Sequence, residues 1–103
     1  MLVNKGYAAG DIVGFKLVNG DEIVAKVVET LEDGYLVSKP LTLVPSHKGI
    51  GLVQSMFSAD INSSITLNKS SIIMHNPAFK DMEDHYLQTT TGIQPVTNGG
   101  IIT

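Results

Sequence analysis

The chain has 103 residues, of which 43% are hydrophobic and 17% are charged, values typical of one small folded domain and not of a disordered tail. The net charge is −3, and all seven basic residues are lysines. A protein that wraps nucleic acid without sequence preference carries a basic face, so any nucleic-acid role here requires a small local site, repeated by oligomerisation. The absence of cysteine excludes disulfides and cysteine-based metal or redox sites.

The beginning of the chain, "MLVNKGYAAG", is rich in glycine and alanine and predicts a loose lead-in over residues 1–10. Residues 1–11 lack the apolar stretch of a signal peptide, and no apolar run in the sequence approaches the length of a membrane span. We therefore expect a cytoplasmic location and no membrane partner.

The segment "FKLVNGDEIVAKV" (15–27) predicts a β-hairpin, because apolar residues alternate on both sides of Asn-Gly. The first strand is expected at about 12–18. A two-residue turn would place Glu22 opposite Leu17 on the core face. A three-residue loop over 19–21 keeps every apolar residue on one face, with Asn19 or Gly20 at positive φ. It pairs Leu17 with Ile23, Phe15 with Ala25 and Val13 with Val27.

The chain continues with four more expected strands. The second strand covers about 22–31, and a tight turn at 32–34 leads into a third at 35–44. Pro40 requires an edge position or a bulge in that third strand. A fourth strand at 50–59 is broken by "DINSS" and resumed by "ITLN", and a fifth occupies 71–75.

After residue 76 the hydrophobic period changes, which predicts a helix from 77 to about 88, capped by Asn76 with Pro77 in its first turn. Phe79, Met82 and Tyr86 form one stripe and are expected to point inward and pack, either on their own barrel or on a neighbour. The tail over 89–103 is polar and Gly-rich, and we expect it to be mobile or paired to a sheet edge. No internal repeat or domain boundary is evident, so the chain is read as a single domain, 1–103.

Five short, bent strands in about 65 residues favour a small SH3-like barrel. The segment "FKLVNGDEIVAKVVETLEDGYLVSK" resembles the first motif of Sm-like (LSm) proteins, most closely the bacterial Hfq type. Downstream, "LNKSSIIMHNP" resembles the second motif, in which a Lys-His turn precedes the closing strand; Lys69 falls on the lysine, and Ser70 replaces the histidine. The insertion "SADINSSITLNKS" and the acidic C-terminal helix resemble the Sm-like proteins of marine cyanophages.

This resemblance implies a mainly β fold: an Sm-like barrel of five strongly bent antiparallel strands over about 11–76, with a C-terminal helix. It also implies a cyclic homo-oligomer of five to seven subunits, in which the fourth strand of one subunit pairs with the fifth of the next. The RNA-binding positions it implies for short single-stranded RNA are Gly34, Tyr35, Asn68, Lys69 and Ser70. Tyr35 would stack on a base and Lys69 would meet a phosphate or a base edge. The alternatives are that Tyr35 is a strand residue that fills the rim of the barrel and that Lys69 is a solvated lysine of a turn.

Three functional hypotheses follow from these observations. The first is an RNA-binding ring with little affinity for duplex DNA. The second is a ring or adaptor that serves protein assembly without nucleic acid, which the acidic charge and the absence of arginine favour. The third is a monomeric SH3-like binder of peptides.

Other chemistry has little support in the sequence. Asp81 and His85 have the i, i+4 spacing of a metal pair, but the buried stripe next to them predicts that both face water. Glu32 and Asp33 flank a turn glycine without a nearby nucleophile, and no serine lies in an activating motif. We expect no enzymatic activity, no metal and no cofactor.

Overall fold

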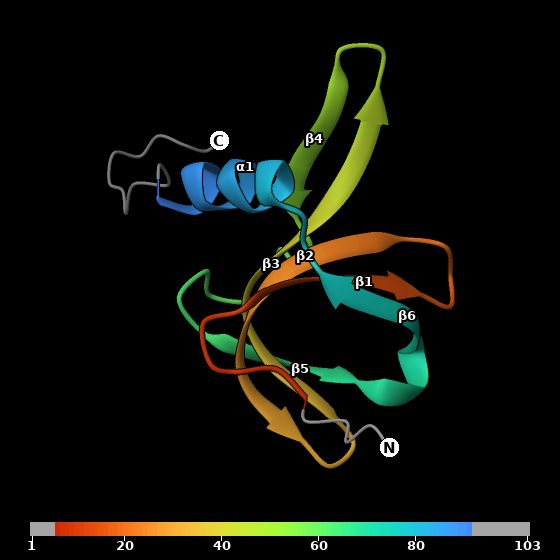
Figure 1. Ribbon diagram of the computed structural model, residues 1–103, viewed down its shortest axis with the longest axis vertical. Helices are drawn as coiled ribbons and strands as arrows, with labels where there is room; N and C mark the ends of the chain where they lie inside the picture. The colour runs from red at the N-terminus through yellow and green to blue at the C-terminus, as the bar shows by residue number, and fades with distance from the viewer. Residues whose placement is uncertain (1–5, 92–103) are drawn as a thin grey trace.

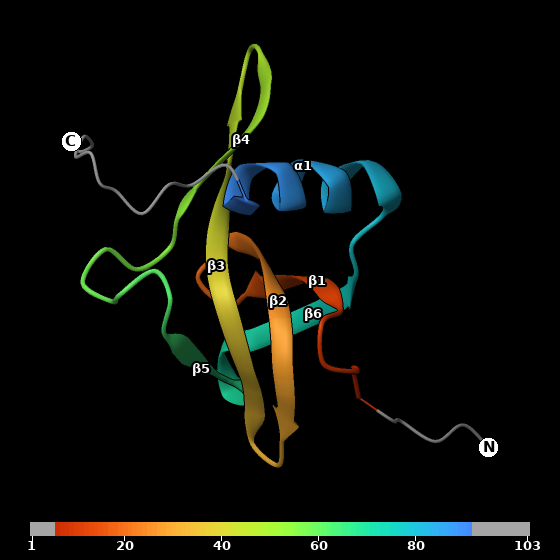
Figure 2. The ribbon, with the colours of Figure 1, turned by 90° about the vertical axis from the view of Figure 1, so that its left-hand side faces the viewer.

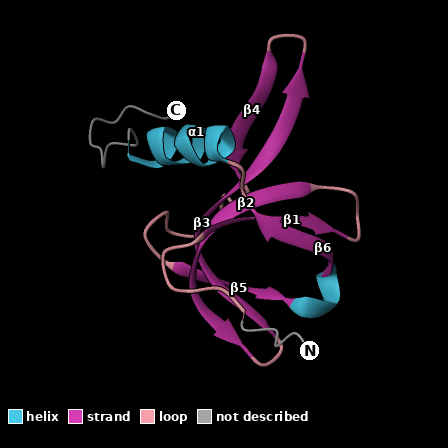
Figure 3. Cartoon of the chain, viewed as in Figure 1, coloured by secondary structure: helices cyan, strands magenta, loops and turns pink. Residues whose placement is uncertain are grey.

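The computed structural model describes residues 6–91, and the parts of the expected lead-in and tail at residues 1–5 and 92–103 lie outside this range. The described chain is mainly β with one C-terminal helix, as the sequence predicts (Figures 1 and 3). Its strands are β1 (Ile12–Leu17), β2 (Glu22–Leu31), β3 (Gly34–Ser46), β4 (Gly49–Gln54), β5 (Ser64–Asn68) and β6 (Ile72–Pro77). A 3-10 turn, η1 (Lys69–Ser71), precedes β6, and the helix is α1 (Lys80–Thr91).

All six strands belong to one antiparallel sheet with the order β4-β3-β2-β1-β6, and β5 pairs with β3 beside β4. Within residues 6–91, no ladder joins β6 to β4 or to β5. The sheet is therefore bent but not closed, which differs from the closed barrel implied by the resemblance. The outer edge of β6 lies at one end of the sheet, and the outer edges of β4 and β5 lie at the other end.

The side chains of the β1–β2 hairpin lie on the predicted faces of the sheet, but the two strands pair in a different register. Phe15 pairs with Ile23, and Lys16 with Glu22. The backbone N–H of Leu17 donates to the carbonyl of Asp21 (2.8 Å), so the three-residue loop covers 18–20 and not 19–21. Gly20 supplies the positive φ, 97°, as expected for a bulge-type turn. The predicted pairing is wrong by two residues, a shift that leaves the same side chains in the core.

The long strand β3 changes direction at Lys39 and Pro40. Lys39 has a φ of 50°, and the β2–β3 ladder skips from the Val24–Leu41 pair to the Lys26–Ser38 pair. Because proline has no N–H to donate to a neighbouring strand, Pro40 lies in this break, as the sequence predicts. Figure 2 shows β3 running from the base of the molecule into the hairpin that projects beyond α1.

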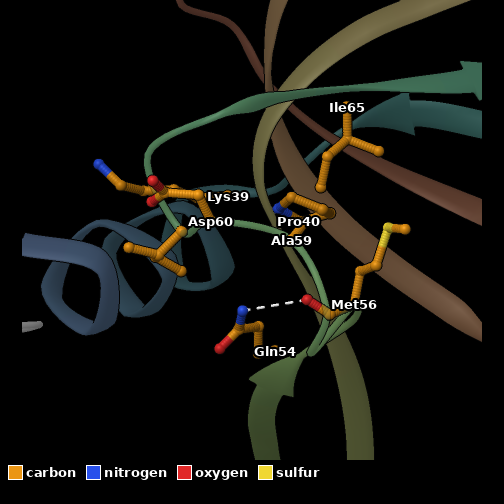
Figure 4. Close-up of a pocket in the computed structure, with 8 residues that line it drawn as sticks. Lys39, Pro40, Gln54, Met56, Ala59, Asp60 and Ile65 are labelled. Carbon is orange, nitrogen blue, oxygen red and sulfur yellow. Dashed lines mark hydrogen bonds between the residues drawn. The ribbon is translucent and has the colours of Figure 1, made fainter.

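The break divides β3 into two halves with different partners. The half from Leu41 onward pairs with β4, and the half from Gly34 to Ser38 pairs with β5. Residues 55–63 form the excursion that separates β4 from β5, so the single interrupted strand expected at 50–68 is present as two strands. Figure 4 shows Ala59 and Ile65 around Pro40, and the side-chain amide of Gln54 donating to the carbonyl of Met56 at 3.0 Å.

The helix begins three residues later than predicted. Pro77 is the last residue of β6, and Asn76 lies in that strand, so Asn76 is not the helix cap. The carbonyl of Phe79 accepts the first helical hydrogen bond, from the N–H of Glu83 (2.9 Å). Of the expected stripe, Tyr86 is fully buried and Met82 half-buried, but the side chain of Phe79 is 67% exposed. The prediction that Phe79 packs on its own barrel is wrong.

Two hydrophobic clusters hold the fold together. The first lies on the concave side of the bent sheet, and its buried members are Val13, Phe15, Ile23, Ala25, Val27, Tyr35 and Val37. The second lies between the opposite face of the sheet and α1, and its buried members are Ile12, Val24, Leu41 and Tyr86. Successive residues of β1 and β2 point alternately into the first and the second cluster, as the two-residue period of a strand requires. Between residues 6 and 91, no helix has the length and apolar character needed to cross a membrane.

Candidate functional site

The fold brings the two halves of the implied RNA site together. Gly34, at the start of β3, pairs with Asn68, at the end of β5. The N–H of Lys69 donates to the carbonyl of Asp33 at 2.8 Å, which joins η1 to the β2–β3 turn. Two segments more than thirty positions apart in sequence therefore meet at one corner of the molecule. This corner contains Gly34, Tyr35, Asn68, Lys69 and Ser70.

Gly34 is buried, and its role in this corner is steric. A Cβ atom at this position would overlap the carbonyl oxygen of Leu67 and lie 3.1 Å from the Cα of Asn68. Such contacts cannot be relieved by rotating a side chain, because the neighbouring atoms belong to the backbone of β5. Glycine here allows β3 and β5 to approach closely, so this residue positions the turn.

Tyr35 is buried in the subunit, with only 6% of its surface exposed. Its ring lies 5.3 Å from Phe15, 5.8 Å from Tyr7 and 5.8 Å from His75, measured between ring centroids. Base stacking needs an open aromatic face, and the packing of Tyr35 leaves none accessible in the subunit. Its observed environment is that of a core residue.

Tyr7 and His75 form an aromatic contact next to Tyr35, and the sequence did not predict it. The hydroxyl of Tyr7 lies 2.6 Å from Nδ1 of His75, and the two rings meet edge-on. Burial, the largest cause, raises the pKa of Tyr7 above its usual value, with smaller contributions from Tyr35 and Asp11. The expected loose lead-in therefore contains a residue that packs on the core, and its signal in the sequence was the single aromatic side chain at position 7.

The exposed part of the corner is polar. Asn68, Lys69 and Ser70 are all exposed. The one salt bridge among residues 6–91 joins Lys80 to Asp84, so the Lys69 ammonium has no carboxylate partner in this part of the chain. This cation can meet a phosphate without first breaking an ion pair.

The Asp81 and His85 pair does not form part of a larger metal-ligand cluster. Nε2 of His85 lies 3.3 Å from the carbonyl oxygen of Ile50, on the neighbouring hairpin. The described residues contain no group of three or more acidic or histidine side chains that could hold a metal ion. His85 therefore contacts the β3–β4 hairpin, a role that helical spacing alone could not indicate.

A large groove lies elsewhere, on the α1-facing side of the sheet. This groove has a volume of about 630 Å³ and runs over β1, β2 and β6 beside the beginning of α1. Its side chains come mainly from apolar residues, including Ile50, Met74, Phe79 and Met82. The sequence carried one signal for it, the apolar run "SIIM" in the last strand, which does not alternate with polar residues.

A scan against protein-family models and a search of curated proteins each found no match to this chain.

Proposed function

We propose that this protein is a ring-forming subunit of Sm-like type, which assembles head to tail into a cyclic homo-oligomer of five to seven copies. The observation that carries this proposal is the open, strongly bent sheet with β4 at one end and β6 at the other. Pairing of unlike edges is a heterologous contact, and such a contact forms a ring when its rotation closes. The same contact would continue the sheet of one copy into the sheet of the next.

The composition of the two edges supports this pairing. Both strands have six residues, "GIGLVQ" in β4 and "IIMHNP" in β6, and neither contains lysine. Monomeric proteins protect exposed edges with charges, proline or a covering element. Here the only such device is Pro77, at the very end of β6, while Ile73 and Val53 are exposed. These edges therefore favour association with another strand.

The test is the mass of the protein in solution at micromolar concentration. We expect 55 to 77 kDa, which is five to seven times the subunit mass of 11.0 kDa, by light scattering after size exclusion. Ile73→Lys, which places a charge on the open edge, should lower the mass. Val18→Lys introduces the same charge at an exposed loop position outside both edges and is the matched control. A wild-type mass of 11 kDa would refute the ring.

A second candidate function, weak binding of short single-stranded RNA by this ring, is favoured by the exposed turn at 68–70. Symmetry would repeat Lys69 once per subunit, so several weak contacts along one strand add through effective concentration. Because Tyr35 is buried, we assign the contact to Lys69 and its polar neighbours and not to base stacking. The assembled ring would carry about −15 to −21, five to seven times the chain's −3, which opposes binding of long polyanions.

Titration of labelled oligouridine and oligoadenine at low salt tests this candidate. We expect weak binding that decreases with salt and with Lys69→Ala, and little binding of duplex DNA. Lys26→Ala changes the charge equally on a central strand and serves as the control. A ring that binds neither oligonucleotide at tens of micromolar would leave protein assembly, without nucleic acid, as the function.

A further inference from the structure

The groove beside α1 borders the open edge of the sheet. Met74 and Asn76, on β6, form the wall nearest that edge, and Phe79 lies where the chain turns from β6 into α1. Figure 1 shows the arrangement: the β3–β4 hairpin projects above β1 and β6, and α1 begins beside the base of this hairpin. A strand that pairs with the outer edge of β6 would therefore place alternate side chains on the same face as Met74 and the groove.

Two of these residues expose large apolar surfaces. The side chain of Phe79 is 67% exposed and that of Met74 is 63% exposed. They line the same groove, so their surfaces form one patch and are not scattered single residues. A contiguous apolar patch with a polar rim is typical of an interaction surface.

The direction of the strands determines which part of a strand paired with β6 would reach the apolar patch of Met74 and Phe79. Every pair in the sheet is antiparallel, and an antiparallel partner of β6 runs from Pro77 toward Ile72. If that partner is β4 of a second copy, its first residue, Gly49, lies at the Pro77 end. The tip of the second copy's β3–β4 hairpin then reaches the beginning of α1.

The charges at these two places are complementary. The hairpin tip carries His47 and Lys48, both exposed, and the first turn of α1 carries Asp81 and Glu83. Lys80 already forms a salt bridge of 3.0 Å with Asp84, so it does not neutralise Asp81. An exposed lysine brought to this turn would meet carboxylates near the positive end of the helix dipole, where acidic residues are favoured.

We infer that the groove is the docking site for the β3–β4 hairpin of a second copy of this chain. Ile50 of the second copy packs against Met74 and Phe79, and Lys48 of the second copy faces Asp81. The inference rests on the proposed ring. To the pairing of strands it adds a contact between side chains, and this contact determines which edge of the second copy pairs with β6 and in which direction. The apolar part of this contact provides affinity, and the charged part fixes the orientation.

A comparison of two exposed phenylalanines tests the apolar contact. Phe79→Ala should raise the apparent dissociation constant of the assembly by about tenfold or more, as expected for an aromatic anchor at an interface. Phe57, 82% exposed and outside the groove, provides the matched control, Phe57→Ala, which should leave assembly unchanged. The measurement is the mass distribution over a dilution series. Loss of assembly in Phe57→Ala but not in Phe79→Ala would overturn the inference.

A charge-reversal pair tests the orientation. Lys48→Glu alone and Asp81→Lys alone should each weaken assembly, and the double variant should restore it, because the pair then forms with opposite polarity. Circular dichroism checks that each variant is folded. Additive losses without rescue would overturn the Lys48 contact.

The inference and the ring can fail separately. A wild-type protein that stays monomeric refutes the ring, and the docking site with it. A ring that forms equally well in the wild type, Phe79→Ala and Lys48→Glu refutes the docking site and leaves the ring intact.

Discussion

The hydroxyl of Tyr86, in the middle of α1, donates a hydrogen bond of 2.9 Å to the carbonyl oxygen of Lys39, the residue at which β3 changes direction. The same hydroxyl lies 3.0 Å from the carbonyl oxygen of Ser38, so the bond is shared between two acceptors. Lys39 is the one non-glycine residue of the described chain with a positive φ. The helix thus supplies a donor to the carbonyl of Lys39, a residue that pairs with none of the strands beside β3.

Removal of this hydroxyl should destabilise the protein. Tyr86→Phe leaves the ring in place but leaves the carbonyls of Ser38 and Lys39 without this donor, and the expected loss in the free energy of unfolding is about 1–2 kcal/mol. Tyr86→Ala also empties the space of a fully buried ring, and its expected loss is about 3–5 kcal/mol. Urea denaturation at neutral pH measures both. Equal effects of the two variants would contradict this account.

Stability should also fall at high pH. Burial raises the pKa of Tyr86 to about 12, from 10.0 in an exposed tyrosine. The folded state therefore keeps this proton where the unfolded state has lost it, so the stabilisation is complete below pH 10 and is lost between pH 10 and about 12. The loss is on the order of 2–3 kcal/mol.

The control for this pH effect is Tyr86→Phe, which has no hydroxyl to ionise. All other side chains are identical in the two proteins, so the difference between the two unfolding curves isolates Tyr86. An identical decline in the wild type and in Tyr86→Phe would show that other groups cause it.

Gly34→Ala should be strongly destabilising, by more than about 2 kcal/mol, because the new methyl group meets the backbone of β5. Gly14→Ala is the matched control, since the nearest atoms to a Cβ at that position are 3.8 Å away. Thermal unfolding distinguishes the two variants. If RNA binding is lost in Gly34→Ala, the unfolding data show whether lost folding explains it.

Two phenylalanines should differ sharply in their contribution to the stability of the subunit. Phe15 is fully buried, so Phe15→Ala should cost about 3–5 kcal/mol. Phe79 is mostly exposed, so Phe79→Ala should change the free energy of unfolding of the isolated subunit by less than about 0.5 kcal/mol. Denaturation at the lowest practical protein concentration separates this effect from assembly. A large loss in Phe79→Ala under these conditions would place its ring in the core.

The β1–β2 hairpin shows what hydrophobic patterning can predict. Alternation determines which side chains face the core, and Phe15, Ile23 and Ala25 do so. A shift of two residues leaves these faces unchanged, so the pattern cannot choose between registers that differ by two. The choice is made in the loop, where the N–H of Asp21 donates to the side chain of Asn19 at 3.0 Å.

Other features depend on contacts distant in sequence. Pro77 suits the first turn of a helix, but the N–H of Ala78 donates to the carbonyl of Ile12 (2.9 Å), so β6 continues through residue 77 and Phe79 falls outside the helix. The pairing of Gly34 with Asn68 agrees with the implied site. Tyr35 packs in the strand, which is the alternative to base stacking that the sequence left open, and the part of its contact that comes from Tyr7 had no signal in the patterning of residues 1–10.

The division of β3 at Pro40 makes the molecule tolerant to insertion at one place. β3 pairs with β4 and with β5 in two separate ladders, and the excursion at 55–63 joins β4 to β5. Lengthening a surface loop costs little, about 0.6 kcal/mol for each doubling of its length. A peptide tag or a small domain inserted next to the exposed residue Phe57 would therefore leave both registers unchanged, and every copy in an assembly would carry the added cargo at an equivalent position.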